Sequence, residues 1–344
     1  MKRLVTLLMV LLLCSVLFAE GTAELTESDA GRKIPIRVLI LPKLEVGEMS
    51  GDFPGEAQYF YDEYVKGGQE YEIQGAFEGN KLYVKDNVAL YVTGMGKVNS
   101  TISTLSILMD DRFDFSDAYV ISVGSADSAT INTVMGDVFI ITTAIDYDLG
   151  HHADPRDLAD INDPTWFHDD SYDSSSVIYL SKPLTDRAFE LVENTKLETT
   201  EKTRKFMSAA FNGTPWAVRD PQVMKGTIVT ADNFWKGEYN QRTAIQMTEE
   251  YGCPDPYVCS DMEDVAIGVV LKRVGMLDRF LIVRSSVNMD VFMLGATPES
   301  LWGKEKILQP AESEVESADI FATAMESNFK VGRIIIDAIL NGTF

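Results

Sequence analysis

The sequence predicts a three-layer α/β/α protein in which helices cover both faces of a mixed central sheet. Two observations support this fold class. Short apolar runs that are typical of buried strands alternate along the chain with segments of helical periodicity. In addition, one unit recurs at Gly94, at Gly124 and from Cys259 onward, an apolar strand followed by a turn of small residues and a helix. Such alternation is typical of a sheet between two layers of helices.

The individual elements follow from the same patterns. Glycine, asparagine and aspartate residues mark turns between the apolar runs. The apolar runs predict strands in residues 36–42, 70–77, 81–84, 88–96, 113–127, 226–237, 256–259 and 280–290. Segments of helical character predict helices in residues 55–65, 97–111, 259–275 and 317–342.

The predicted helix at 259–275 begins with a group of acidic residues. Asp261, Glu263 and Asp264 occupy the first turn of a segment that is otherwise almost wholly apolar. Unsatisfied backbone N–H groups and the helix dipole favour negative charge there, which accounts for Asp261 and for Asp264. Glu263 follows a short strand at the point where an α/β sheet meets its helix, the usual position of a ligand. We therefore treat Glu263 as a candidate site residue.

The first residues have the layout of a secretory signal peptide. Lys2 and Arg3 precede an apolar run over residues 4–18, and small residues follow it. We expect residues 1–19 to be the signal, with cleavage between about residues 19 and 23, and residues 20–35 to be a polar leader. The mature protein is then expected to be secreted, periplasmic or attached to the cell surface.

The remaining residues, 36–344, are expected to form a single domain. Residues 146–176 are polar, rich in aspartate and interrupted by two prolines, and we interpret them as an excursion from this domain and not as a linker between two domains. No segment after the signal is long and uncharged enough to cross a bilayer. We expect no membrane span in the mature chain.

The formal net charge of −23 restricts the partners of the protein. Nucleic-acid phosphates and anionic lipids would be repelled, so a small neutral or cationic substrate fits better and no nucleic acid is expected. Two cysteines, Cys253 and Cys259, remain after removal of the signal. An oxidising compartment would allow them to pair, and two unpaired thiols are the alternative.

Several common catalytic signatures are absent from the sequence. The segment TGMGKVN lacks the third glycine of the dinucleotide fingerprint and has Tyr91 where a P-loop needs glycine. The segment VGSAD is not a G-x-S-x-G nucleophile elbow. His151 and His152 are adjacent, so on a strand they would face opposite ways, and together with His168 they make a weak metal site. We expect no metal and no cofactor.

Five turns of small residues at the ends of predicted strands resemble, in their order, those of the nucleoside phosphorylase and nucleosidase superfamily. More specifically the chain resembles the purine nucleoside permease family, which shares a TGMG-x-x-N turn, a D-x-x-W-x-G turn and an S-N-x-D ending. The resemblance spans most of the mature chain and implies the nucleoside phosphorylase type of fold. The five turns are TGMGK at 93–97, VGSAD at 123–127, TADNFW at 230–235, SDME at 260–263 and RSSVN at 284–288.

The resemblance implies roles for the residues in these turns. A protein that cleaves a purine nucleoside must hold the ribose hydroxyls, enclose the base and place a hydrogen-bonding group at the N7 side of the purine. By the family likeness Glu263 holds the ribose hydroxyls and Met262 packs on the sugar. Phe234, with Trp235 beside it, stacks on the base, and Asn288 meets N7 or the 6-substituent.

The chain also departs from its relatives in ways that affect the expected chemistry. Nucleosidases that act on methylthioadenosine carry an aspartate where Asn288 stands, and asparagine cannot donate a proton as that acid does. Asn288 is more similar to the phosphorylases that favour 6-oxopurines such as inosine and guanosine. Bacterial phosphorylases place arginines near the phosphate, whereas Ser122 stands at one of these positions and LPKLEVGE replaces the other. Phosphate is therefore a doubtful co-substrate.

Without phosphate, water is the expected nucleophile. Glu45 or Glu48, after the first strand, would be its base, as glutamates at that place are in nucleosidases, and solvated loop charges are the alternative for both. Ser125, Gly96 and Asn99 would line the water side of the pocket.

The leading hypothesis is thus a secreted purine nucleosidase that hydrolyses the N-glycosidic bond. The rivals are a nucleoside-binding component of uptake without catalysis, a phosphate-dependent phosphorylase, and an acidic secreted protein whose pocket has lost its function. Relatives of this fold commonly complete their pockets across subunit contacts, which implies a homo-oligomer.

Overall fold

The computed structural model describes residues 32–129, 133–160, 163–210, 219–296 and 313–344, with side chains described from Asp319 onward in the last range. Residues Pro35–Phe344 form one compact unit. The predicted signal peptide at 1–19 lies outside the described residues, as does the polar leader except for its last four residues. None of the helices in the described ranges combines the length and the apolar character of a bilayer span.

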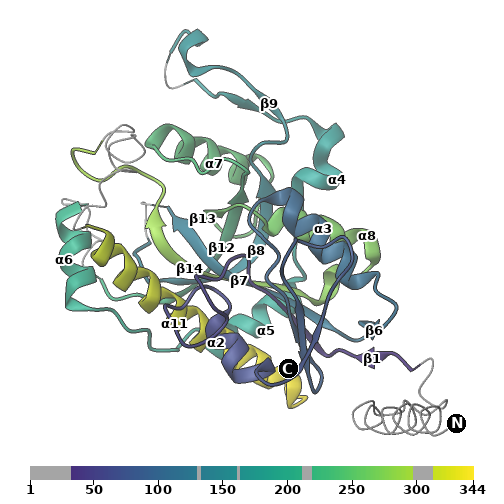
Figure 1. The fold of residues 1–344 in the computed structure, drawn as a ribbon. Coiled ribbons are helices and arrows are strands. Elements are labelled where there is room, and N and C mark those ends of the chain that lie inside the picture. The colour runs from purple at the N-terminus through teal and green to yellow at the C-terminus, as the bar shows by residue number, and fades with distance from the viewer. Residues whose placement is uncertain (1–31, 130–132, 161–162, 211–218, 297–312) are drawn as a thin grey trace, which may run out of the picture. The chain divides into compact units, whose positions relative to one another are not determined.

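A mixed sheet of ten strands forms the centre of the unit (Figure 1). Both parallel and antiparallel pairs occur in it, and helices pack on it, so the predicted α/β class with a mixed sheet is confirmed. Its strands, in spatial order, are β11 (Val177–Tyr179), β8 (Val138–Asp146), β12 (Val223–Thr230), β13 (Tyr257–Asp261), β7 (Tyr119–Ser128), β2 (Val38–Leu41), β5 (Val88–Leu90), β4 (Leu82–Lys85) and β3 (Gln69–Tyr71), with β14 (Phe280–Met289) paired to both β7 and β8.

The double pairing of β14 changes the shape of the sheet. β14 lies parallel to β7 and antiparallel to β8, while β8, β12, β13 and β7 are neighbours in that order. These five strands therefore close into a ring within the mixed sheet. Strands that converge in this way bring several loops to one end of the ring, where a site can be assembled from distant parts of the sequence.

Helices and short strands complete the unit. The small strands outside the main sheet are β1 (Ile34–Pro35), β6 (Phe113–Asp114), β9 (His151–His152) and β10 (Trp166–Phe167). The helical segments are α2 (Gln58–Phe60), η1 (Tyr61–Val65), η2 (Pro155–Asp157), η3 (Asp170–Tyr172), α3 (Lys97–Leu108), α4 (Asp173–Ser176), α5 (Lys182–Val192), α6 (Glu201–Ala210), α7 (Glu238–Glu250), α8 (Asp264–Val274), η5 (Leu277–Arg279) and α11 (Ser313–Leu340).

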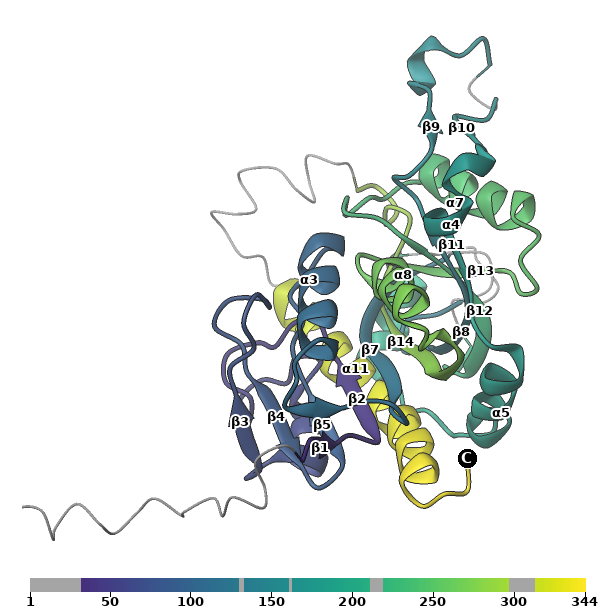
Figure 2. The ribbon, with the colours of Figure 1, turned by 90° about the vertical axis from the view of Figure 1, so that its right-hand side faces the viewer.

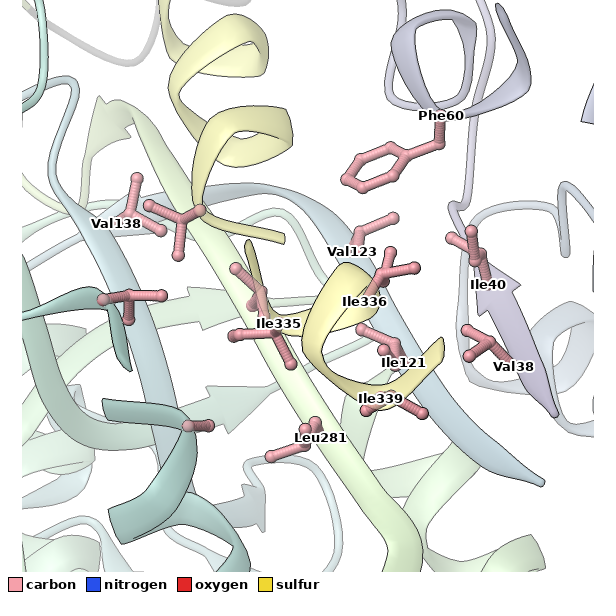
Figure 3. Close-up of a cluster of buried hydrophobic side chains, with 14 of the residues drawn as sticks. Val38, Ile40, Phe60, Ile121, Val123, Val138, Leu281, Ile335, Ile336 and Ile339 are labelled. Carbon is pink, nitrogen blue, oxygen red and sulfur yellow. The ribbon is translucent and has the colours of Figure 1, made fainter. Parts of the chain in front are cut away.

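The main core lies between the sheet and α11 (Figure 3). Val38 and Ile40 of β2 and Ile121 and Val123 of β7 point into it, because alternate residues of a strand face the same side. They meet a row of isoleucines from α11, namely Ile335, Ile336 and Ile339. Every one of these side chains is at most 1% exposed, so each contributes about 1.5–3 kcal/mol by leaving water.

The other side of the ring faces α8. Val283 of β14 belongs to the core under α11, whereas the next residue, Arg284, forms an ion pair with Asp264 at the start of α8. Adjacent residues of one strand thus reach helices on opposite sides. α3 packs alongside α8, as Figure 2 shows. This arrangement puts the first turns of α3 and α8 at the same end of the ring.

The polar excursion at 146–176 has some structure of its own. β9 and β10 pair as an antiparallel hairpin, with Trp166 opposite His152 (Figure 2). Trp166 is 1% exposed and packs in a small apolar cluster that includes Trp235. The excursion is therefore held to the main unit by a buried tryptophan, and residues 161–162 within it lie outside the described residues.

Cys253 and Cys259 are both free. Cys259 is buried within β13, and Cys253 follows α7 in a partly buried turn. The pairing that an oxidising compartment would allow is absent, and the alternative with two unpaired thiols holds.

Candidate functional site

One cavity collects residues from strand ends, loops and a helix that are far apart in the sequence. β7 contributes Ser125 and Asp127, and the junction of β13 with α8 contributes Ser260 to Glu263. The end of β14, the loop between β12 and α7, the loop between β2 and α2, and α11 supply the other walls. The full lining is Lys43, Leu44, Glu56, Met95, Ser125, Ala126, Asp127, Asn233, Phe234, Trp235, Ser260, Asp261, Met262, Glu263, Arg284, Val287, Asn288 and Phe321.

The acidic residues at the start of α8 have different partners. Oδ2 of Asp261 accepts hydrogen bonds from the backbone N–H groups of Glu263 at 3.1 Å and of Asp264 at 2.8 Å, so Asp261 caps the helix. Glu263 is 3% exposed and lines the cavity. Its Oε1 accepts a hydrogen bond from the N–H of Gly96 at 3.0 Å, and its Oε2 lies 3.2 Å from Nη2 of Arg284. The Glu263 carboxylate is thereby fixed from two sides.

Arg284 joins the acidic residues under the cavity into one network. Its Nε donates to Asp264 Oδ2 at 2.7 Å, its Nη2 donates to Asp261 Oδ2 at 2.6 Å, and its Nη1 donates to the carbonyl oxygen of Ser125 at 2.9 Å. The side chain is 1% exposed. A buried guanidinium with all of its edges occupied stabilises the carboxylates around it and is not available as a free cation.

Lys43 is the second buried cation of this network. Its Nζ donates to the carbonyl oxygens of Leu41 at 2.7 Å and Val123 at 3.1 Å, and to the hydroxyl of Ser122. Nζ also lies 3.7 Å from Asp264 Oδ1. Burial lowers the pKa of Lys43, and Arg284 lowers it further. The ammonium group is thus directed into the protein beneath the cavity.

The carboxyl groups of the network differ in their pKa. Burial, with the Asp264 carboxylate close by, raises the pKa of Asp261 to about 8. Burial acts on Asp264 in the same direction, but Arg284 and Lys43 outweigh it and lower the pKa of Asp264 to about 2. Burial also raises the pKa of Glu263. The network therefore carries less negative charge than its composition alone would give.

Glu56 is a lining residue that the sequence analysis missed. Its Oε1 accepts hydrogen bonds from the N–H of Ser125 at 2.8 Å and from the Ser125 hydroxyl at 2.7 Å, and its Oε2 accepts one from the N–H of Lys43 at 2.8 Å. Gly124, with φ of +147°, makes room for it, since a Cβ there would lie 2.5 Å from the Glu56 carboxyl carbon. The glycine of the VGSAD turn was the available signal, because it marks a close approach.

The two glutamates proposed to activate water lie elsewhere. Oε1 of Glu45 accepts hydrogen bonds from the N–H groups of Val46 and Gly55, and Oε2 accepts them from Ala57 and Gln58. Glu45 thereby ties its loop to the start of α2. Glu48 is exposed, and neither glutamate belongs to the cavity lining. The structure brings Glu56, and not these two residues, into the lining of the cavity.

Most of the other residues predicted from the five turns lie in the wall of the cavity. Phe234, Trp235, Met262, Ser125 and Asn288 all line the cavity. Phe234 is 51% exposed, whereas Trp235 is 9% exposed and packs in the cluster around Trp166.

Two predicted residues from the TGMGKVN turn do not line the cavity. Gly96 contacts Glu263 through its backbone N–H. Asn99 lies in the first turn of α3, where its side chain donates to the carbonyl oxygen of Met95 at 2.8 Å. Met95 itself belongs to the lining. Within the described ranges no group of three or more His, Cys, Asp or Glu side chains is arranged to hold a metal ion.

Comparison with known proteins adds to this geometry. Residues 35–343 match the family model described as purine nucleoside permease. A probable purine nucleoside permease of Schizosaccharomyces pombe is 23% identical over 296 residues, which cover 76% of this chain and 80% of that protein.

Solved structures are similar in fold. A 5′-methylthioadenosine/S-adenosylhomocysteine nucleosidase from Colwellia psychrerythraea, in complex with adenine, superposes with a TM-score of 0.54 at 14% identity, covering 89% of this chain and 96% of that one. Futalosine hydrolase of Helicobacter pylori superposes with a TM-score of 0.52 at 15% identity, covering 88% and 97%. The nucleoside phosphorylase type of fold expected from the sequence is confirmed by these likenesses.

Proposed function

Because the chain belongs to the purine nucleoside permease family, we propose that its cavity binds a purine nucleoside and hydrolyses the N-glycosidic bond. The observation that carries this proposal is the presence of two buried carboxylates, Glu56 and Glu263, in one cavity with Phe234 and Asn288. The two carboxylates can accept hydrogen bonds from the hydroxyl groups of a sugar and from a water molecule. The ring of Phe234 can stack on a flat heterocycle, and the amide of Asn288 can form hydrogen bonds with the edge of that heterocycle.

Glu263 is the residue that binds the ribose in this proposal. A carboxylate accepts hydrogen bonds from two neighbouring hydroxyl groups, and the N–H of Gly96 and the guanidinium of Arg284 already fix its orientation. Met262 packs on the sugar. Phe234 stacks on the purine, and Asn288 offers its amide to N7 or to the 6-substituent.

Glu56 is the base that activates water in this proposal. Three hydrogen bonds from Ser125 and from the backbone of Lys43 hold its carboxylate still, as a general base requires. A water molecule gives a proton to Glu56 while its oxygen bonds to C1′ of the ribose. The bond from C1′ to N9 breaks with its electron pair on the purine, which takes up a proton at a ring nitrogen from a second water molecule. The hydroxide that remains takes the proton from Glu56, which restores the carboxylate. The products are ribose and the free base.

Water is favoured over phosphate because the cations of the lining are already paired. The donors of Arg284 are directed at Asp261, Glu263, Asp264 and the Ser125 carbonyl, and the Lys43 ammonium points beneath the cavity. A phosphate dianion that entered among the described lining residues would meet the carboxylates of Glu56 and Glu263. Like charges at short range in a buried site repel strongly.

Binding without catalysis is the second candidate function. The name of the family and of the Schizosaccharomyces pombe relative favours it. A nucleoside-binding component of uptake needs Glu263, Phe234 and Asn288 but has no need of a base at Glu56. For both candidate functions we propose that residues 1–19 are removed as a signal peptide and that the protein acts outside the cytoplasm.

The deciding experiment incubates the purified chain, expressed without residues 1–19, with inosine, guanosine and adenosine, with and without phosphate, and separates the products. Free base without phosphate supports hydrolysis. Free base that forms only when phosphate is present indicates phosphorolysis in place of hydrolysis. Intact nucleoside with measurable binding supports the uptake candidate, and neither binding nor turnover of any nucleoside refutes the proposed function. Glu63→Gln, an exposed glutamate on η1, is the matched control for substitutions of the buried glutamates.

A further inference from the structure

We propose that Asp127 selects the purine base, because it holds the amide of Asn288 in one orientation and so favours 6-oxopurines over 6-aminopurines. This inference rests on the proposed binding of purine nucleosides in the cavity. Asp127 is the last residue of the VGSAD turn, and no role for it follows from the sequence alone. The structure makes it a lining residue that is 7% exposed.

A bulge in β14 brings the two side chains together. In the register of β7 with β14, Ser286 pairs with Ala126, and Asn288 pairs with Asp127. Val287 is the extra residue that the partner strand does not match. A bulge of this kind re-aims the side chain that follows it. Asn288 consequently lies beside Asp127 on the neighbouring strand, and both line the cavity. The Asn288 amide is close enough to lower the pKa of the Asp127 carboxyl.

The chemistry of this pair decides how the amide is turned. A carboxylate only accepts hydrogen bonds, whereas the amide of Asn288 has a donor side and an acceptor side. The NH₂ group must therefore face Asp127. Rotation of the amide by half a turn would place its carbonyl oxygen against the carboxylate, two acceptors facing each other in a buried place.

Lys236 keeps Asp127 in the form that this argument needs. Its Nζ lies 2.9 Å from Asp127 Oδ2 and is further held by the carbonyl oxygen of Met289. Burial raises the pKa of the Asp127 carboxyl, and the Lys236 ammonium and the Asn288 amide act against it. The other charged group that acts on this pair is Asp290, which is buried beyond it and repels Asp127. The ion pair with Lys236 favours the carboxylate of Asp127.

A fixed amide distinguishes the two kinds of purine. With one N–H engaged by Asp127, the second N–H of Asn288 is a donor for the base. A 6-oxopurine presents two adjacent acceptors there, N7 and O6. A 6-aminopurine presents N7 next to an N6 amino group, which is a donor, so the N–H of Asn288 would meet another N–H. Turning the amide would relieve this contact, and Asp127 prevents the turn.

The test compares the affinities of wild type and Asp127→Asn for free hypoxanthine and free adenine by calorimetry. An amide at position 127 has a donor of its own, so Asn288 is released to face either way. We expect wild type to bind hypoxanthine more tightly, and the ratio of the two affinities to fall by roughly tenfold in the variant. Asp127→Ser, which also removes the acceptor-only group, takes the place of Asp127→Asn if that variant does not fold.

The outcomes separate this inference from the function on which it rests. If Asp127 were only a structural partner of Lys236, both affinities would fall together, and an unchanged ratio overturns the inference. Tighter binding of adenine by wild type also overturns it. If wild type binds neither base nor any nucleoside, the proposed function fails and the inference fails with it. Retained binding with a shifted ratio supports both.

Discussion

Oε1 of Glu56 accepts two hydrogen bonds from Ser125, one from its backbone N–H at 2.8 Å and one from its hydroxyl at 2.7 Å. The two residues come from different walls of the cavity, the loop after β2 and the end of β7. A carboxylate that is held this firmly is either a structural anchor or a base in a fixed position. Kinetics can separate these possibilities.

Glu56→Gln is expected to lower turnover by about 10²-fold or more with little change in nucleoside affinity. Glutamine keeps the shape of the side chain and can accept from Ser125, but it cannot take a proton from water. Turnover numbers and dissociation constants are measured separately, with Glu63→Gln as control. A parallel series with Glu45→Gln and Glu48→Gln tests the residues that the sequence indicated. Full turnover in Glu56→Gln would remove the general base from the mechanism.

Glu263→Gln is expected to weaken binding of nucleosides while leaving binding of the free base nearly unchanged. A carboxylate that accepts from two ribose hydroxyls contributes about 1.5–3 kcal/mol, which corresponds to roughly 10–100-fold in affinity. The free base does not have these hydroxyls. Calorimetric titration of inosine and of hypoxanthine into the same variant gives the comparison. Equal losses for both ligands would show that Glu263 supports the cavity as a whole and does not hold the sugar.

The sequence was sufficient for those parts of the site that depend on local rules. The cap at Asp261 and the inward position of Glu263 follow from the order of a strand, a helix start and three acidic residues. The mixed α/β fold follows from the alternation of strands and helices. Both depend on interactions within a few residues or on periodicity, and these are visible without coordinates.

The rest of the site depends on contacts between distant segments. Glu56 comes 15 residues after the end of β2, and only the folding of that loop brings it to Ser125. Glu45, nearer to the strand, looked equally suitable but is used by four backbone N–H groups. The position of Arg284 in the sequence does indicate that this residue has buried partners. An arginine inside an apolar strand must find buried partners, and here the acidic start of α8 supplies them.

Stability should depend on pH through Asp290. Burial and the Asp127 carboxylate raise the pKa of Asp290 to about 7, against about 3.9 in an unfolded chain. The folded state therefore favours the neutral acid. Its contribution to stability is fully present below about pH 4 and is lost as the pH rises through about 7, by on the order of 1 kcal/mol per pH unit. Asp290→Asn removes this dependence.

The measurement is the free energy of unfolding in urea for wild type and Asp290→Asn from pH 4 to pH 8. The difference between the two proteins should shift against wild type as the pH rises. The hydroxyl groups of Tyr257 and Ser260 donate hydrogen bonds to Asp290, and both can still form hydrogen bonds with an asparagine at this position. A difference that is constant across this range would contradict the assignment.

Two copies of the chain are expected to associate through α3. Val98, Ile102, Leu105 and Met109 recur at helical spacing and are between 43% and 67% exposed. Residues 87–109 contain no aspartate or glutamate, in a chain that has 53 of them. A chain with a net charge of −23 repels its own copies, so a surface that is apolar and free of acids is where a second copy meets the least repulsion.

Light scattering coupled to gel filtration tests this association. We expect the mass of a dimer for wild type and of a monomer for Ile102→Glu. Leu340→Glu, at an exposed apolar residue at the end of α11, is the matched control. Added salt should favour the dimer, because it screens the repulsion between the two acidic chains. Met95 lies one turn before Val98 and lines the cavity, so a second α3 packed here would lie close to the mouth of the site. Loss of nucleoside affinity in Ile102→Glu together with loss of the dimer would show that the partner completes the site, and a monomeric wild type would refute the association.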